Sequence, residues 1–200
     1  METSRDELKK ILAAINSRDE KNFSAHVDLK NLMDTAYDEA TDVLAENCAA
    51  FHELYPKDLF FKFGSRILRL YNEKFRGVHL GLIEKVIAAY FDGSFRDAKN
   101  FSSTPIKFLA AELNNLLRAI HSEFVDEKIS GDKNFLAVKM VGDDSDYGKM
   151  IGTLNFLLEF DRRGDEWRLV KIKNVEELVP PILDIAEKYW PASWDLGIKL

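Results

Sequence analysis

The chain contains a single cysteine, Cys48, among its 200 residues. One cysteine permits neither an intramolecular disulfide nor a metal site built from several thiolates. Cys48 lies within a helical pattern of apolar residues, where a thiol usually behaves as a small hydrophobic side chain. We therefore expect Cys48 to be buried and unreactive rather than a nucleophile.

Long apolar runs are also missing. No stretch approaches the roughly 20 residues that cross a bilayer, and the first residues lack the basic and apolar regions of a signal peptide. The sequence predicts a soluble protein with the cytoplasm as its default location, although a secreted chain whose leader had been removed would look the same. The formal net charge of −6 and the pI near 5.3 argue against nucleic acid as a partner, because that role needs a basic surface.

Recognisable catalytic and metal motifs are missing as well. There is no HExxH, GxSxG or P-loop, and the four histidines do not have metal-ligand spacing (His26, His52, His79 and His121). Asp143, Asp144 and Asp146 form an acidic run, but Asn155 stands where a calcium loop starting at Asp144 needs its closing glutamate. The sequence therefore predicts no catalytic residue, no metal site and no cofactor.

The most regular pattern runs from Lys149 to Asn174 and predicts a β-hairpin, which we expect to be the longest of its sheet. Apolar side chains alternate with mixed ones: Leu154, Phe156, Leu158 and Phe160 face one way, whereas Thr153, Asn155, Leu157 and Glu159 face the other. A polar turn with Gly164 leads to a return strand that begins at Trp167. The apolar face is expected to cover a core, with Trp167 at least half buried.

The rest of the chain organises itself around this hairpin as a single domain. Residues 1–121 have mostly helical periodicity, residues 122–174 have the pattern of strands, and residues 175–200 that of a helix and tail. Within the helical part we expect a cap near Thr3, a long helix from Asp28 towards Leu54 and a break at Gly77. Helices followed by strands predict an α+β fold. We expect an N-terminal helical layer packed on a C-terminal four-stranded antiparallel sheet.

Two stretches carry a resemblance to a known fold. The apolar strand, the charged turn and EWRLVKIKN at the end of the hairpin are similar to the closing hairpin of the nuclear-transport-factor-2-like superfamily, within the cystatin-like α+β folds. The opening helix, which ends near Arg18 and Asp19, also resembles such domains, and Val27-Asp28 resembles small uncharacterised bacterial members. In that superfamily the helices lie across a curved sheet and a cavity opens between them.

The resemblance implies a cone-shaped pocket, for which the candidate residues are Tyr37, Tyr90, Asn155, Phe156 and Trp167. Asp92 is a further polar side chain expected to point inward. Our first hypothesis is a non-enzymatic domain that binds a small apolar ligand or a protein partner. The alternatives are a cone-pocket enzyme of the isomerase or dehydratase type, as some members of the superfamily are, and a structural subunit. A homodimer formed through the sheet is a further expectation.

Overall fold

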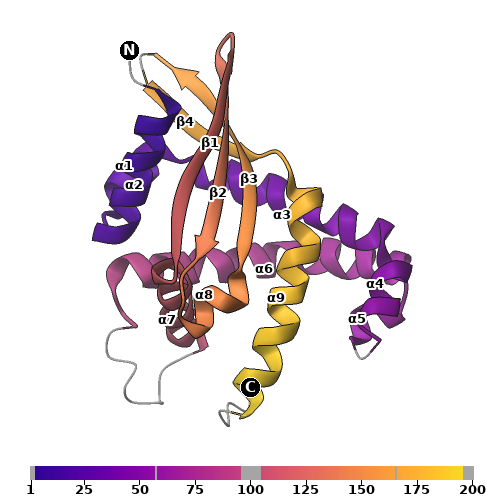
Figure 1. The fold of residues 1–200 in the computed structure, drawn as a ribbon. Coiled ribbons are helices and arrows are strands. Elements are labelled where there is room, and N and C mark those ends of the chain that lie inside the picture. The colour runs from indigo at the N-terminus through magenta and orange to yellow at the C-terminus, as the bar shows by residue number, and fades with distance from the viewer. Residues whose placement is uncertain (1–2, 57, 96–104, 165, 196–200) are drawn as a thin grey trace.

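Helices come first along the chain and strands follow. The computed structural model describes residues 3–56, 58–95, 105–164 and 166–195 (Figure 1), and the statements below concern these residues. The elements are α1 (Ser4–Ser17), α2 (Glu20–His26), α3 (Leu29–Glu46), α4 (Cys48–Leu54), α5 (Leu59–Lys62), α6 (Ser65–Asp92), α7 (Pro105–Arg118), β1 (Ile120–Ser130), β2 (Lys133–Gly142), α8 (Asp146–Ile151), β3 (Thr153–Arg163), β4 (Glu166–Ile172) and α9 (Val175–Asp195). The α+β class is confirmed. Residues 196–200 of the expected tail lie outside the described part.

The sheet is an antiparallel meander in the order β1-β2-β3-β4. Hairpin β3–β4 lies where the sequence predicts it, but it is not the longest. β1 and β2 pair from Ile120 opposite Gly142 to Ser130 opposite Lys133, whereas β4 ends at Ile172, where the chain turns into α9. Sheet pairing begins at Ile120, two residues before the predicted start, and includes His121, the last residue of the part that was expected to be mostly helical.

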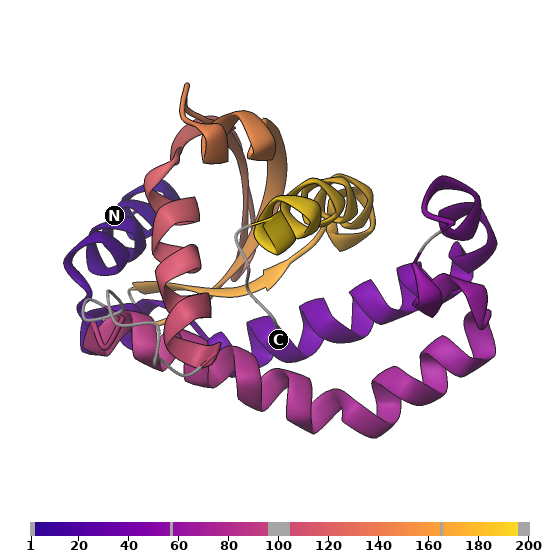
Figure 2. The same cartoon turned by 90° about the horizontal axis from the view of Figure 1, so that it is seen from below.

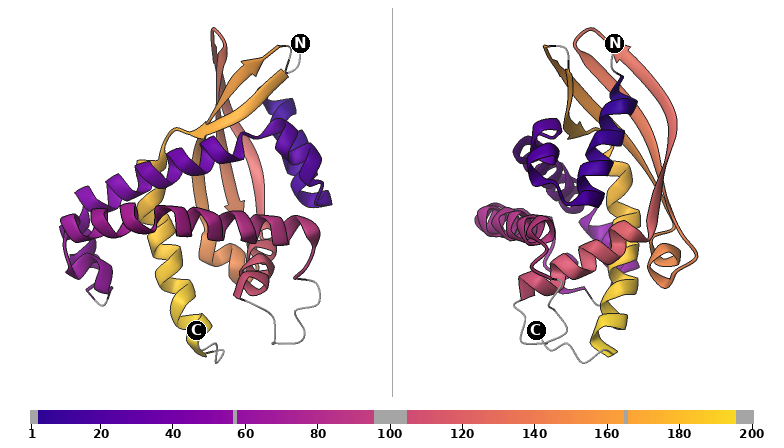
Figure 3. Two further views of the ribbon diagram at one scale, coloured as in Figure 1. Left: turned by 180° about the vertical axis from the view of Figure 1, so that it is seen from behind. Right: turned by 90° about the vertical axis from the view of Figure 1, so that its left-hand side faces the viewer.

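The N-terminal helices lie on one side of the sheet, and part of them extends beyond it. In the right-hand view of Figure 3, α1, α2, α3 and α6 lie on one side of the strands, with α6 at the outer margin. Figure 2 shows α3 and α6 running side by side past the edge of the sheet, with α4 and α5 at their far end. We call residues 29–92, which form α3 to α6, the helical arm.

Two apolar cores hold these layers together. The first lies between the sheet, α1, α2, the end of α6 and α7, and its buried members include Leu8, Phe23, Tyr90, Leu136 and Phe160. The second lies between the helical arm and α9, and its buried members include Cys48, Phe51, Phe61, Leu68 and Val179. The burial of Cys48 is as predicted. The second core fastens the arm to the C-terminal helix.

The helix starts follow the capping rules. The Thr3 hydroxyl accepts a hydrogen bond from the Asp6 amide, and the Asp6 carboxylate bonds back to Thr3, which makes a capping box. The Asp28 carboxylate accepts from the Asn31 amide at the start of α3. Both caps are at or next to the positions that the sequence predicts.

Three local predictions are wrong. α6 passes through Gly77 without a break. A helical glycine costs only about 1 kcal/mol relative to alanine, and the buried residues Leu68 and Leu80 on either side and the contact of α6 with α3 favour a continuous helix. The predicted long helix divides at Asn47 into α3 and α4. Residues 122–174 were expected to form strands, but the short helix α8 lies among them, and Ser145 caps it through the Gly148 amide.

Candidate functional site

Side chains fill the space beside the sheet face that was expected to line a cone-shaped cavity. Leu136, Val138, Leu158 and Phe160 project from β2 and β3 into the first core and are buried. Tyr90 and Trp167, both pocket candidates, are buried in the same core. The Tyr90 hydroxyl donates to the Ile15 carbonyl at 2.9 Å. These side chains pack against α1, α2 and the end of α6, in the space where the resemblance places a cavity.

The remaining pocket candidates do not join Tyr90 and Trp167. Phe156 is half buried at the edge of the first core. Asn155 is exposed; it was expected to point inward, but strand alternation turns it to the face opposite Phe156. Asp92 is also exposed and bonds the Ser94 amide at the end of α6. Tyr37 lies on the helical arm, so the five candidates do not form one pocket.

A buried pair that the sequence does not reveal joins α1 to α2. His26 Nδ1 lies 2.5 Å from Glu7 Oε1, and the Glu7 side chain is fully buried. Lys10 Nζ lies 3.4 Å from the other carboxylate oxygen. A carboxylate that orients an imidazole is the arrangement that many general bases use. The signal was hidden because the two residues are far apart in sequence and the turn between α1 and α2 brings them together.

A second buried polar group joins α1 to the sheet. The hydroxyl and amide of Ser4 and the side-chain amide of Asn134 all donate to Glu127 on β1. Burial tends to raise the pKa of Glu127, but these hydrogen bonds and the charge of Arg5 outweigh it, so the pKa lies below its ordinary value. Ser4 and Glu7 are one helical turn apart and both are fully buried. This face of α1 is therefore anchored by polar contacts at two points.

The helical arm has a hollow of about 310 Å³ between α3 and α6, lined by Tyr37, Asp38, Thr41, Asp42, Arg69 and Glu73. Arg76 binds Asp34 and Asp38, and Arg69 binds Asp42. The Tyr37 hydroxyl lies 2.7 Å from Nδ1 of His79, and burial raises the Tyr37 pKa. Arginine side chains already bind the aspartates at this hollow. We therefore interpret the hollow mainly as part of the contact between α3 and α6.

A second hollow, of about 290 Å³, lies between α7 and α8 and is lined by Asn115, Arg118, Ala119, Asp143, Ser145 and Tyr147. Beside it, the Glu112 carboxylate accepts hydrogen bonds from the hydroxyls of Tyr147 and Tyr189, each at 2.8 Å. Burial and the bond to Glu112 raise the pKa of both tyrosines. Glu112 thereby ties α7 to α8 and α9. Within the residues described, no cluster of three or more His, Cys, Asp and Glu could hold a metal ion.

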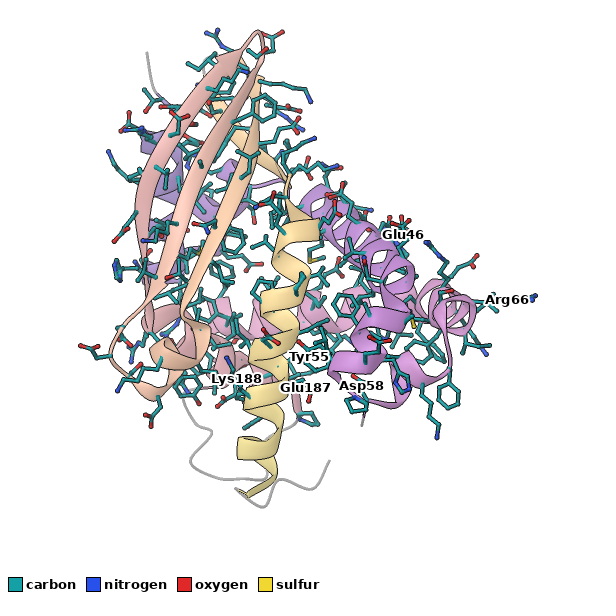
Figure 4. The ribbon with its side chains drawn as sticks, turned by 45° about the vertical axis from the view of Figure 1, so that its right-hand side comes forward. Glu46, Tyr55, Asp58, Arg66, Glu187 and Lys188 are labelled. Carbon is teal, nitrogen blue, oxygen red and sulfur yellow. The ribbon has the colours of Figure 1, made fainter. Side chains whose placement is uncertain are left out.

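The contact of α9 with the arm is closed by a polar pair. The Tyr55 hydroxyl donates to Asp184 on α9. Burial, this hydrogen bond and the charge of nearby Glu187 raise the Tyr55 pKa to about 12. Figure 4 shows Tyr55 and Glu187 where α9 passes the arm, whereas Arg66 points away into solvent. These groups seal the edge of the second core.

The outer face of α6 is different, because it leaves large apolar side chains in water. Ile67, Leu70, Val78 and Leu82 on α6 are exposed, Val78 to 66%, and Phe63 in the turn just before the helix is exposed to 62%. The intervals from Ile67 to Leu70, from Leu70 to Val78 and from Val78 to Leu82 are three, eight and four residues. This spacing places the four side chains on one face of the helix. We call these four residues and Phe63 the α6 surface. Exposed large apolar side chains gathered on one surface are typical of interaction sites.

No family model, no curated protein and no solved structure matches the chain. None of the helices in the described ranges has the length and apolar character needed to cross a membrane. The candidate site is therefore defined by geometry alone, and the α6 surface is the candidate that gathers several exposed large apolar side chains on one helix.

Proposed function

We propose that this chain is a non-enzymatic protein-binding domain whose binding site is the α6 surface. The observation that carries the proposal is the exposure of four large apolar side chains along one helix and of a fifth in the turn before it. Each such side chain that a partner removes from water contributes about 1.5–3 kcal/mol when fully buried. Two or three of them at the centre of an interface would supply the hot spot that most interfaces depend on.

Contacts of the helical arm also hold the α6 surface in a fixed position. Ion pairs of Arg69 and Arg76 fasten α6 to α3, and the second core fastens the arm to α9. A rigid helix loses little conformational freedom when a partner binds, so more of the contact energy appears as affinity. The α6 surface is thus held in place before any partner arrives.

The class of fold belongs to the same proposal. A four-stranded antiparallel meander with helices across one face supports a nuclear-transport-factor-2-like domain, and the helical arm is then an elaboration of it. The small-apolar-ligand hypothesis loses support, because Leu136, Phe160 and Trp167 fill the sheet face that would line its cavity.

An enzyme of the cone-pocket type is the second candidate, and the Glu7–His26 pair is the observation that favours it. A general base must reach a substrate atom, directly or through one water. His26 is only 8% exposed, and the sheet face beside α1 is packed with apolar side chains. The geometry suits a contact that joins α1 to α2 better than a catalytic base.

Site-specific photocrosslinking in cells that produce the protein tests the proposal. A photoreactive phenylalanine analogue at Val78 should give a covalent protein adduct, and Ile67→Asp in the same chain should abolish it. The matched control is Val125 on β1, which is 61% exposed but lies far along the chain on the sheet. Adducts of equal yield from both positions, or none from Val78, would refute a binding role for α6.

A further inference from the structure

We infer that the α6 surface binds the α6 surface of a second copy of this chain, with the two helices antiparallel. The inference rests on the proposed function and names its partner. It replaces a homodimer through the sheet with one through the arm. Three features of α6 carry it: the distribution of side-chain size along the helix, the placement of its unpaired charges, and its outward bow.

The exposed face of α6 carries both large and small side chains. Ile67 and Leu70 near the start of the helix, and Val78 and Leu82 further along, are large and exposed. Gly77, Gly81 and Ala88 are small. A Cβ added at Gly77 or Gly81 would meet no atom within 4 Å, so another backbone can approach there. An antiparallel arrangement can set large residues near the start of one helix against small residues near the end of the other.

Charge selects one register of this packing. When Gly77 of one copy lies opposite Gly81 of the second, antiparallel counting places Lys74 opposite Glu84 and Glu73 opposite Lys85. Two-fold symmetry then repeats each pair. The same register sets Leu70 against Ala88. A single alignment therefore satisfies size and charge together.

These four charged side chains are available for the interface. All four are exposed, and in the part of the chain that the structure describes none of them forms an ion pair. Along the helix, no acidic residue lies three or four positions from Lys74 or Lys85, and no basic residue lies at those distances from Glu84. Glu73 has Arg69 four residues before it and Arg76 three residues after it, but these arginines bind aspartates of α3. Opposite charges facing each other across the helices favour this orientation over others.

The bend of α6 makes the middle of the helix protrude from the molecule. Figure 2 shows the helix bowed, with its convex side turned away from the sheet and from α3. In the right-hand view of Figure 3 the helix lies at the outer margin of the molecule. The residues between Gly77 and Gly81 lie near the middle of α6, so two copies meet first at the positions that allow the closest approach.

Sedimentation or light scattering of the full chain over a wide range of concentration tests the inference. The expected result is a reversible species of twice the 23.0 kDa chain mass. Lys74→Glu should raise the dissociation constant about five- to thirtyfold, because symmetry turns two attractive pairs into repulsive ones. Glu84→Lys should do the same, and the double variant should restore dimerisation because the pairs form again with reversed sign.

Gly77→Leu provides a second route that does not depend on charge. The added side chain enters open space and improves helix propensity, so the monomer should keep its fold and melting temperature while the dimer is lost. Val125→Glu on the sheet is the control and should leave dimerisation unchanged. A dimer that is insensitive to Gly77→Leu but abolished by Val125→Glu would overturn the inference in favour of the sheet.

The two proposals fail differently. A chain that stays monomeric at every concentration, while a crosslinker at Val78 yields adducts of some mass other than twice that of the chain, refutes the dimer and leaves protein binding by α6 standing. A monomeric chain without adducts from Val78 refutes both.

Discussion

Nδ1 of His26 lies 2.5 Å from Oε1 of Glu7, and this contact joins α1 to α2 inside the protein. The Glu7 side chain is fully removed from water, so its charge depends on the few groups that touch it. Burying a carboxylate without such partners is strongly unfavourable. We therefore expect disruption of the pair to destabilise the first core strongly.

His26→Leu should destabilise the protein by about 3–5 kcal/mol, because it removes the imidazole partner of a fully buried carboxylate. Glu7→Leu together with His26→Leu should recover most of that loss, since apolar residues often replace a buried pair at little cost. Urea unfolding measures both. Lys30→Leu, which breaks the exposed pair with Asp34, is the control and should leave stability nearly unchanged, because exposed ion pairs contribute little. A comparably small loss for His26→Leu would mean that the pair contributes little.

Trp167→Ala should destabilise the protein by about 3–5 kcal/mol, as expected for a large core aromatic. Trp167 is 4% exposed, and the Arg162 guanidinium lies over its ring. Denaturant unfolding followed by circular dichroism measures the change. Val125→Ala at an exposed site of the same sheet should shift stability by less than about 0.5 kcal/mol.

Glu127 should make stability depend on pH in the acid range. Its pKa is lower in the folded protein than its ordinary 4.5, so the ionised form stabilises the fold above that value. The contribution is lost as the pH falls through the depressed folded pKa. The difference in unfolding free energy between wild type and Glu127→Gln should be largest near neutral pH and shrink in acid. A difference that is the same at every pH would contradict this origin.

Gly142→Ala should destabilise the protein by about 1–3 kcal/mol, as overpacking does. A Cβ at Gly142 would overlap the Gly148 carbonyl, where the end of β2 touches α8. Gly77→Ala, in open space on α6, should instead stabilise by about 0.5–1 kcal/mol. Thermal melts of the two variants should move in opposite directions, and a similar shift in both would place Gly142 in a looser junction than the structure shows.

Periodic segments were predictable because their side chains repeat against one surface over many residues. Leu158 and Phe160 face the first core as alternation requires, and Asp28 caps α3. The predicted helix break at Gly77 was wrong, because the helical residues on both sides of Gly77 and the packing of α6 against α3 outweigh the low helix propensity of one glycine. Helix α8 was missed because six residues are too few to show a period.

The candidate site was less predictable than the fold. Trp167 and Tyr90 are buried as aromatic residues in a core pattern should be, yet burial did not make them line a pocket. Asn155 was misplaced because its polarity was given more weight than its position in the strand. The Glu7–His26 pair had no signal in sequence, since its geometry depends on the left-handed turn at Arg18 that folds α2 back onto α1.

By itself the sequence determined the order of helices and strands, the α+β class, the hairpin β3–β4 and which face of its strands is apolar. Those properties depend on local periodicity and capping, which neighbouring residues carry. Only the tertiary structure decided that the expected cone is packed, that Glu7 and His26 meet, and that the apolar stripe of α6 remains in water. Each of these depends on which distant surfaces come together, and the same apolar pattern describes a helix whether or not another element covers it.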